Sequence, residues 1–470
     1  MRSLFFAAIA SFAVVSIKAD TPKNVLFFLV DDLGIADLSC YGSAYHETPN
    51  LDAFAQTAAR YTNSYAANPV CSPTRAAIMT GRYPTRVGIS DWIPGANPPN
   101  PKLITPKIAD NLALSEVTIA EHLKANGYQT YFCGKWHLGD KGHFPEDQGF
   151  DINIGGHHRG APPGGYYAPF KNPKLENKPD DHHLTARLTK ETINFLNTRN
   201  KSKPFFIYHS FYQVHTPTQG DDQFDNYFAE KAKSIENPTA TRKEHDGVTR
   251  LLQSNHKYAA MVKSMDQAVG QMLDELDRLG LADDTLVIFT SDNGGLSTKP
   301  RITSTSNEPY RAGKGWCYEG GIRVPLMIRA PGKTDPGSEI NTPAVSMDFF
   351  PTILGYLGLD QRPDLHMDGV NLISTIGKPN ADRGPIIWHY PHYHGSTWAP
   401  GTAIRDGKWK LVQLYHYQSI ELYDLSKDPS ERNNLAKQRP EKVRELRKLL
   451  AQIQKDSKAE LPYPNPNYKE

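Results

Sequence analysis

The sequence predicts an α/β fold with a large sheet buried between helices, and three strand patterns support this prediction. Residues 24–30, 204–208 and 285–290 are apolar runs of strand length without polar alternation. Such runs are typical of strands buried on both faces, as in a parallel sheet covered by helices. Apolar residues at helical spacing fill 261–279, and Gly280 ends that pattern. Strands that alternate with helices indicate the α/β class.

A smaller α+β subdomain is predicted at the C-terminal end. Residues 403–423 contain short strand-like pieces with a turn at 405–408, and 441–453 form an amphipathic helical pattern. We therefore expect a main domain over 20–375 and a subdomain with a short antiparallel sheet over 376–470.

The N-terminal residues 1–19 have the layout of a secretory signal peptide. Arg2 precedes an apolar run over 4–17, and Ala19 offers a small residue for cleavage. The run is too short to span a bilayer comfortably, and we expect no membrane span elsewhere. The mature protein is expected to be secreted or periplasmic.

The overall composition excludes some functions. The chain has 470 residues, 39% hydrophobic and 22% charged, with a formal net charge of +2, which suits an ordinary globular protein. No global positive field favours nucleic acid as a partner. An anionic substrate must therefore be bound by a local site.

Two predicted strands each end in oxygen-donor side chains. Asp31 and Asp32 follow the first strand, and Asp292 and Asn293 follow the strand over 285–290. Ligands of open α/β sheets bind beyond the carboxyl ends of strands, so both pairs should face one crevice. Oxygen ligands favour Ca²⁺ or Mg²⁺. Either pair alone is better explained as a helix cap or turn, but together they favour a metal site.

The segment 71–81 predicts a short helix with Cys71 at its start. Pro73 suits a first turn, and Gly81 suits the end. Free N–H groups at a helix start attract anions, and Arg75 lies one turn further on. A lone cysteine is more often a small buried hydrophobe, so the residues alone leave the role of Cys71 open.

The run Cys71-Ser72-Pro73-Thr74-Arg75 resembles the C-x-P-x-R signature of the type I sulfatase family. Further segments resemble motifs of that family in the same order, at 30–34, 48–52, 134–139, 214–217, 291–294, 313–315 and 422–425. The resemblance covers nearly the whole mature chain. It implies an alkaline-phosphatase-like fold, with a large mixed, mostly parallel sheet sandwiched by helices.

The resemblance also implies an activity, the hydrolysis of sulfate esters, and its cofactors. A maturation enzyme would oxidise Cys71 to formylglycine, whose hydrate is the nucleophile. The implied Ca²⁺ ligands are Asp31, Asp32, Asp292 and Asn293.

Five further residues receive roles from the same resemblance. Arg75 and Lys135 would hold the hydrate and its sulfate, and His137 would remove a proton to expel sulfate. His215 and Lys314 would bind the sulfate and protonate the departing alcohol oxygen. Histidines suit such proton transfers near neutral pH.

The expected substrate is a sulfated saccharide. Two long loops without strand or helix patterns, 91–107 and 155–178, are expected to shape the binding site. The run 389–394 resembles sulfatases that act on galactose-type sulfates, although packing between the two domains explains it equally well. The predicted substrate contacts are His158, Arg159, His389, His392 and Arg405.

Three alternatives compete with this interpretation. A phosphate or phosphonate monoester hydrolase of the same superfamily would use the same strand ends. A cysteine hydrolase would use Cys71 with His137, but the acidic strand ends would then have no function. An inactive carbohydrate-binding relative would lack a nucleophile or a ligand, and none is missing.

Overall fold

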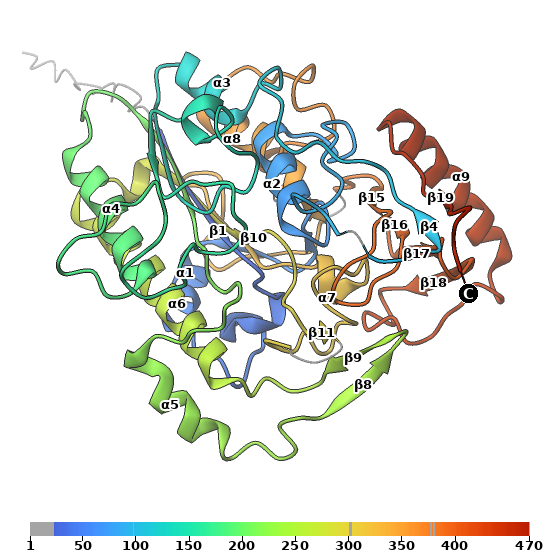
Figure 1. Cartoon of the computed structure of the whole chain (residues 1–470). Coiled ribbons are helices and arrows are strands. Elements are labelled where there is room, and N and C mark those ends of the chain that lie inside the picture. Colours follow the sequence, from blue (N-terminus) through green and yellow to red (C-terminus); the bar gives the residue numbers. More distant parts are fainter. Residues whose placement is uncertain (1–22, 97, 300–302, 377, 379–380, 470) are drawn as a thin grey trace, which may run out of the picture.

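The computed structural model describes residues 23–96, 98–299, 303–376, 378 and 381–469, which form an eight-stranded mixed sheet at the centre of the molecule (Figure 1). Its order is β13 (Glu339–Ile340), β2 (Ala59–Tyr61), β12 (Leu326–Arg329), β10 (Thr285–Ser291), β1 (Asn24–Val30), β7 (Phe205–Ser210), β5 (Gln129–Gly134) and β6 (Ile152–Ile154). The neighbours from β10 to β6 are parallel, whereas β12 is antiparallel to β10 and β2. The predicted mostly parallel sheet is confirmed.

The three predicted strands lie side by side at the centre of this sheet. Asn24 pairs with Thr285 on one side of β1, and Val25 pairs with Phe206 on the other. Every residue of β1 and β10 is buried, as their unbroken apolar character predicts. Because β1 and β10 are parallel and in register, the residues that follow them emerge at the same edge.

Helices cover both faces of the sheet. One face packs against α1 (Pro49–Thr57), α4 (Leu184–Thr198) and α6 (His256–Arg278). The other packs against α2 (Cys71–Thr80), α3 (Ile119–Ala125) and α8 (Phe349–Leu357) (Figure 1). Helix α6 begins earlier than its apolar pattern because the Asn255 side chain caps it by accepting from the Tyr258 N–H.

The C-terminal part forms an antiparallel sheet with one helix against it. Strands β15 (Ile386–Tyr390), β16 (Gly401–Asp406), β17 (Trp409–Leu414) and β18 (Ser419–Asp424) pair in sequence order, and α9 (Pro440–Asp456) packs on them. Trp388 of this sheet shares one apolar core with Tyr65 and Trp316 of the preceding region. The division at residues 375 and 376 therefore stays a prediction.

The remaining elements are short. They are β3 (Ser64–Tyr65), β4 (Leu103–Ile104), α5 (Asp222–Ala232), β8 (Thr241–Glu244), β9 (Gly247–Arg250), β11 (Thr298–Lys299), α7 (Glu319–Ile322), β14 (Ala344–Val345) and β19 (Tyr463–Pro464). Apart from β4, the predicted loops 91–107 and 155–178 contain no helix or strand among their described residues. The predicted signal peptide lies outside the described residues. Within the described residues, no helix is long and apolar enough to cross a membrane.

Candidate active site

Four side chains converge beyond the ends of β1 and β10. Asp31 and Asp32 follow β1, and both are buried. Asp292 and Asn293 follow β10, where the Asp32 N–H donates to Asp292 Oδ1 at 3.1 Å and Asn293 Nδ2 donates to Asp32 Oδ1 at 2.8 Å. The parallel register of the two strands thus brings the predicted metal ligands together.

Three buried cations balance the three carboxylates of this cluster. Lys135 Nζ lies 2.7 Å from Asp31, and Lys314 Nζ lies 2.6 Å from Asp32. Arg75 donates to Asp292 through Nε at 2.9 Å and lies 2.7 Å from it through a terminal nitrogen. Although burial opposes the charge, Lys314 lowers the pKa of Asp32 below its ordinary value. Pairing of this kind keeps a buried carboxylate ionised.

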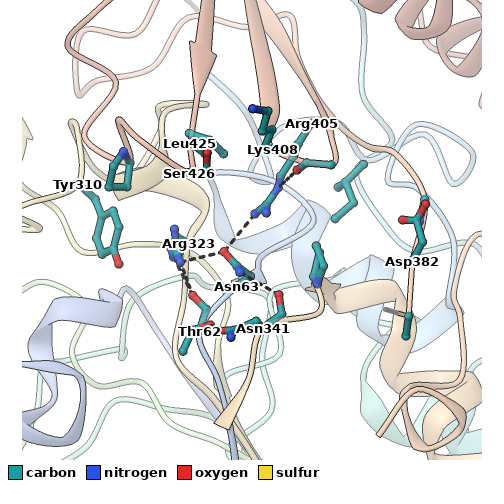
Figure 2. A pocket seen from close by; sticks show the side chains of 16 residues that line it. Thr62, Asn63, Tyr310, Arg323, Asn341, Asp382, Arg405, Lys408, Leu425 and Ser426 are labelled. Carbon is teal, nitrogen blue, oxygen red and sulfur yellow. Dashed lines mark hydrogen bonds between the residues drawn. The ribbon is translucent and has the colours of Figure 1, made fainter. Parts of the chain in front are cut away.

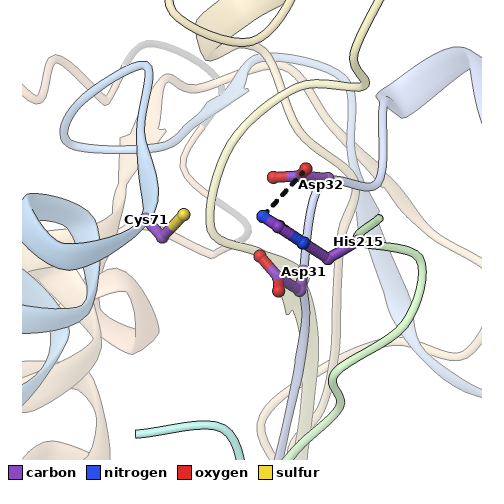
Figure 3. Close-up of side chains that lie close together, drawn as sticks. All are labelled: Asp31, Asp32, Cys71 and His215. Carbon is purple, nitrogen blue, oxygen red and sulfur yellow. Dashed lines mark ion pairs between the residues drawn. The ribbon is translucent and has the colours of Figure 1, made fainter. Parts of the chain in front are cut away.

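The carboxylate and amide oxygens beyond β1 and β10 are ligands that a hard cation prefers, whereas the Cys71 sulfur and the His215 ring nitrogen in the same cluster are not. One ligand atom each from Asp31, Asp32, Cys71 and His215 lies within 4.8 Å of the others (Figure 3). Asp31 Oδ1 and Asn293 Oδ1 are buried and accept no hydrogen bond within the part of the chain that the structure describes. A buried oxygen without a partner is costly, and coordination to Ca²⁺ would satisfy it.

Cys71 lies at the start of α2 and faces this cluster (Figure 3). Its side chain is buried, and Lys314 Nζ lies 3.5 Å from Sγ. Burial raises the pKa of the Cys71 thiol, although Lys135 and Lys314 lower it. A cysteine hydrolase needs a stabilised thiolate, so this environment argues against direct use of the thiol.

Two further side chains hold the start of α2 in place. Thr74 Oγ1 donates to the Asn68 carbonyl at 2.9 Å and accepts from the Asn68 N–H at 3.1 Å. Arg75 also donates to Ser210 Oγ at 2.7 Å, at the end of β7. The helix start is therefore fixed to the sheet edge that holds the carboxylates.

His137 is held in one orientation. Its Nε2 lies 2.7 Å from the Ile93 carbonyl oxygen, so in the neutral ring Nε2 carries the proton. Burial, with Lys135, lowers the pKa of His137 well below its ordinary value, which leaves the ring neutral. Its Nδ1 is buried and has no hydrogen-bond partner among the described residues. His137 Nδ1 therefore has a free lone pair that can accept a proton.

His215 and Lys314 both lie beside Asp32. His215 Nδ1 lies 2.7 Å from the Thr216 carbonyl, and Nε2 lies 3.9 Å from Asp32. Burial and Lys314 lower the pKa of His215 to about 3. Because His215 and Lys314 line the same pocket as Asp32, both side chains can contact an anion that binds there.

Two active-site residues have strained backbones. Asp32 has a φ of 63° and His137 a φ of 60°, in the left-handed region that side chains rarely adopt. Such strain is typical of functional sites, where the surroundings hold a residue against its preference.

A pocket of about 830 Å³ opens over Cys71, Asp32, His137, His215 and Lys314. The predicted substrate residues His158 and Arg159 line it. The pocket also includes His394, from the run 389–394, and residues without a role predicted from the sequence, among them Trp92, Asp110, Asn111, Asp140 and Lys299. Most of these residues belong to segments without a motif. The predicted loop 91–107 was a signal for Trp92, and the run 389–394 was a signal for His394.

Three predicted substrate contacts do not line this pocket. His389 is buried against the Glu460 carbonyl and Gln454, and His392 is buried against Ser90 Oγ at 2.9 Å. Arg405 contacts Tyr65 and Asn63 beside a second cavity of about 650 Å³ (Figure 2). The alternative of packing between the two domains fits the surroundings of these side chains.

Comparison with known proteins gives the class. The sulfatase family model matches residues 23–359, and a model of the N-sulphoglucosamine sulphohydrolase C-terminal region matches residues 311–458. The chain belongs to the sulfatase family and is a sulfuric ester hydrolase.

Named relatives agree with this assignment. Human N-acetylgalactosamine-6-sulfatase is 32% identical over 81% of this chain and 70% of its own length. Human arylsulfatase A is 31% identical over 95% of this chain and 90% of its own length. The crystal structure of Ps i-CgsB in complex with k-i-k-neocarrahexaose has a TM-score of 0.73 at 28% identity, covering 91% of this chain and 93% of that chain. The alkaline-phosphatase-like fold is thus confirmed.

Proposed function

We propose that this sulfatase removes sulfate from a sulfated carbohydrate, with galactose-type units as the favoured class. The observation that carries the proposal is the convergence of Cys71, Asp31, Asp32 and His215 within 4.8 Å, with all but the buried Asp31 lining a large pocket. Human N-acetylgalactosamine-6-sulfatase and the neocarrahexaose complex of Ps i-CgsB support a saccharide substrate. Trp92 on the pocket lining offers an aromatic face for a sugar ring.

The proposed cofactors are Ca²⁺ and formylglycine, made from Cys71 by a maturation enzyme. Asp31, Asp32, Asp292 and Asn293 would hold the ion, and two of their oxygens have no hydrogen-bond partner among the described residues. Together, the modified residue would supply a hydrated aldehyde as nucleophile and the ion would stabilise negative charge on the sulfate.

The chain's own residues supply the remaining chemistry in this proposal. Arg75, Lys135 and Lys314 place three positive charges around the pocket floor, where an anionic ester must be held. His215 and Lys314 contact the sulfate group, and Lys314 donates a proton to the departing alcohol oxygen. His215 does not donate it, because the neutral ring carries its proton at Nδ1, against the Thr216 carbonyl. His137 accepts a proton at Nδ1 from a hydroxyl on residue 71.

Export is part of the proposal. The predicted signal peptide over residues 1–19 would direct the chain to the periplasm or the exterior, where sulfated polysaccharides are met.

The decisive experiment replaces the predicted nucleophile. We expect Cys71→Ala to lower desulfation of sulfated galactosides to background, because no other side chain can take the same position, while circular dichroism stays unchanged. Cys40 is a free, partly exposed thiol that does not line the pocket, so Cys40→Ala is the matched control and should keep activity. Substantial turnover by the Cys71→Ala protein would refute the nucleophile.

Substrate class is tested with defined compounds. Chromatography of sulfated mono- and oligosaccharides after incubation should show free sulfate and the desulfated sugar. A parallel assay with nitrophenyl sulfate and a nitrophenyl phosphonate distinguishes the sulfatase from the phosphonate hydrolase. Preferential turnover of the phosphonate would contradict the proposed activity.

A further inference from the structure

The loop over residues 91–96 connects the start of α2 to His137 through one residue. The Ile93 N–H donates to Ser72 Oγ at 3.1 Å, and Ser72 follows Cys71 directly. The Ile93 carbonyl lies 2.7 Å from His137 Nε2. Ile93 thus bridges the residue next to the nucleophile and the predicted base with its two backbone groups.

The Asp91 carboxyl group fixes the conformation of this loop. Its Oδ1 accepts from the Trp92 N–H at 2.8 Å, and its Oδ2 accepts from the Ala96 N–H at 3.3 Å. The side chain is buried, and burial raises the pKa of Asp91 to about 7. One carboxyl group therefore ties both ends of the segment that carries Ile93.

The C-terminal sheet anchors that carboxyl group. Tyr390, the last residue of β15, donates its hydroxyl to Asp91 Oδ1 at 2.8 Å. His392 Nε2 lies 2.9 Å from Ser90 Oγ, and its Nδ1 lies 3.9 Å from Asp91 Oδ2. The titratable groups facing Asp91 are therefore Tyr390 and His392, and both come from the run 389–394.

The hydrogen bond between the Ile93 carbonyl and His137 Nε2 selects one tautomer of the His137 ring. A carbonyl oxygen only accepts hydrogen bonds, so its contact with Nε2 requires the proton on that nitrogen and leaves Nδ1 with a free lone pair. If the loop shifts, this constraint is lost and Nδ1 can carry the proton instead. A ring in that state cannot accept a proton at Nδ1.

We propose that Asp91 and Tyr390 are positioning residues that hold the Ile93 carbonyl against His137 and so keep its Nδ1 ready to accept a proton. The inference rests on the proposed function, which makes His137 the base. The inference also gives the run 389–394 a structural role, the support of the loop over residues 91–96. This role replaces the predicted direct contact of His389 and His392 with substrate.

The tautomer can be measured on the folded protein with an unmodified Cys71. In protein labelled with ¹⁵N-histidine, the His137 ring is assigned by its loss in His137→Gln, and its two nitrogen shifts report which one carries the proton. We expect a pure Nε2–H ring in the wild type and mixed protonation in Tyr390→Phe and Asp91→Ala. The matched control is Tyr393→Phe, which removes a hydroxyl from the same run, one that contacts Leu103 and His416 and not Asp91.

Two additional readouts keep the test decisive if Asp91→Ala folds poorly. Tyr390→Phe should speed amide hydrogen exchange over 92–96, and in the matured enzyme it should lower kcat about 10-fold or more with little change in KM. A wild-type Nε2–H ring in the folded Tyr390→Phe protein, together with wild-type amide exchange over 92–96, would overturn the inference.

The inference and the proposed function fail separately. If His137→Ala keeps full desulfation, the proposed base is wrong. If His137→Ala removes activity while the Asp91 and Tyr390 variants keep both tautomer and kcat, only the positioning role is wrong.

Discussion

Two single residues beyond the ends of β1 and β10 each have a buried oxygen that is available to the proposed cation. Asp31 Oδ1 and Asn293 Oδ1 are buried and accept no hydrogen bond among the described residues, although Lys135 and Arg75 stand close by. Burial raises the pKa of Asp31 well above its ordinary value, because desolvation and its acidic neighbours outweigh Lys135. A bound divalent ion would reverse this balance.

We predict that Asn293→Ala weakens Ca²⁺ binding, because it removes one oxygen ligand. In the wild type, Ca²⁺ at about 100 times its dissociation constant should stabilise the fold by about 2.7 kcal/mol, seen as a rise in Tm. The variant should need more Ca²⁺ for the same rise. Asp110→Asn, at the mouth of the same pocket, is the control and should respond like the wild type. Equal Ca²⁺-dependent rises in Tm in all three proteins would show that Asn293 is not a Ca²⁺ ligand.

Prediction of site residues from the sequence depended on a motif or a strand end that marked the position. The prediction placed Asp31 and Asp292 beyond the carboxyl ends of two strands and in one crevice, and the pairing of β1 with β10 brings them to the same edge. It failed for His389, His392 and Arg405, because their partners are Glu460, Ser90 and Tyr65, which lie far away in the sequence. An aromatic, histidine-rich run looks the same whether it packs inside or faces a substrate.

At the scale of elements, a buried ion cluster ties the C-terminal sheet to the rest of the molecule. Lys410 of β17 lies 2.9 Å from Glu319 at the start of α7 and 2.8 Å from Glu431, and all three side chains are fully buried. Arg323 also pairs with Glu319 at 3.1 Å. Because these charges are desolvated, each depends on its partners.

We predict that Lys410→Met lowers the free energy of unfolding by about 3–5 kcal/mol, because it leaves the buried Glu431 without its cation and Glu319 with Arg323 alone. Lys408 stands two residues earlier, is half exposed and pairs with Asp424 at 3.0 Å. Its replacement, Lys408→Met, should lower the free energy of unfolding by only about 0–1 kcal/mol. Urea denaturation of both variants measures the difference, and similar midpoints would show that the buried cluster does not stabilise the fold.

Element existence was predictable, whereas several boundaries were not. The apolar runs at β1, β7 and β10 identified central strands. The start of α6 was missed because it depends on the Asn255 cap and not on apolar spacing. Strand β15 is not among the predicted elements, and its last two residues, His389 and Tyr390, belong to the run 389–394 that was predicted to contact substrate.

For the molecule as a whole, buried neutral histidines should make stability fall with acid. Burial lowers the pKa of His209, on β7, to about 3. In the unfolded chain this ring binds a proton below about pH 6.5. Stability is therefore fully present above that pH and is lost as the pH falls from about 6.5 to 3, by at most about 1.4 kcal/mol per pH unit for one ring.

We predict that His209→Gln reduces the pH dependence of unfolding free energy over this window, compared with the wild type. His182 is largely exposed on its side chain, so His182→Gln is the control and should leave the slope unchanged. Denaturation curves at several pH values give the slopes. Equal slopes for wild type and His209→Gln would mean that this ring is not a source of acid sensitivity.

We propose above that residue 71 acts as an oxidised cysteine beside a bound cation. Tryptic peptide 61–75 contains this residue alone among the cysteines, so its mass in active enzyme tests the claim directly. We predict that the peptide carries the aldehyde and that its fraction rises in proportion to specific activity across preparations. Fully active enzyme whose peptide retains an intact thiol would contradict the account.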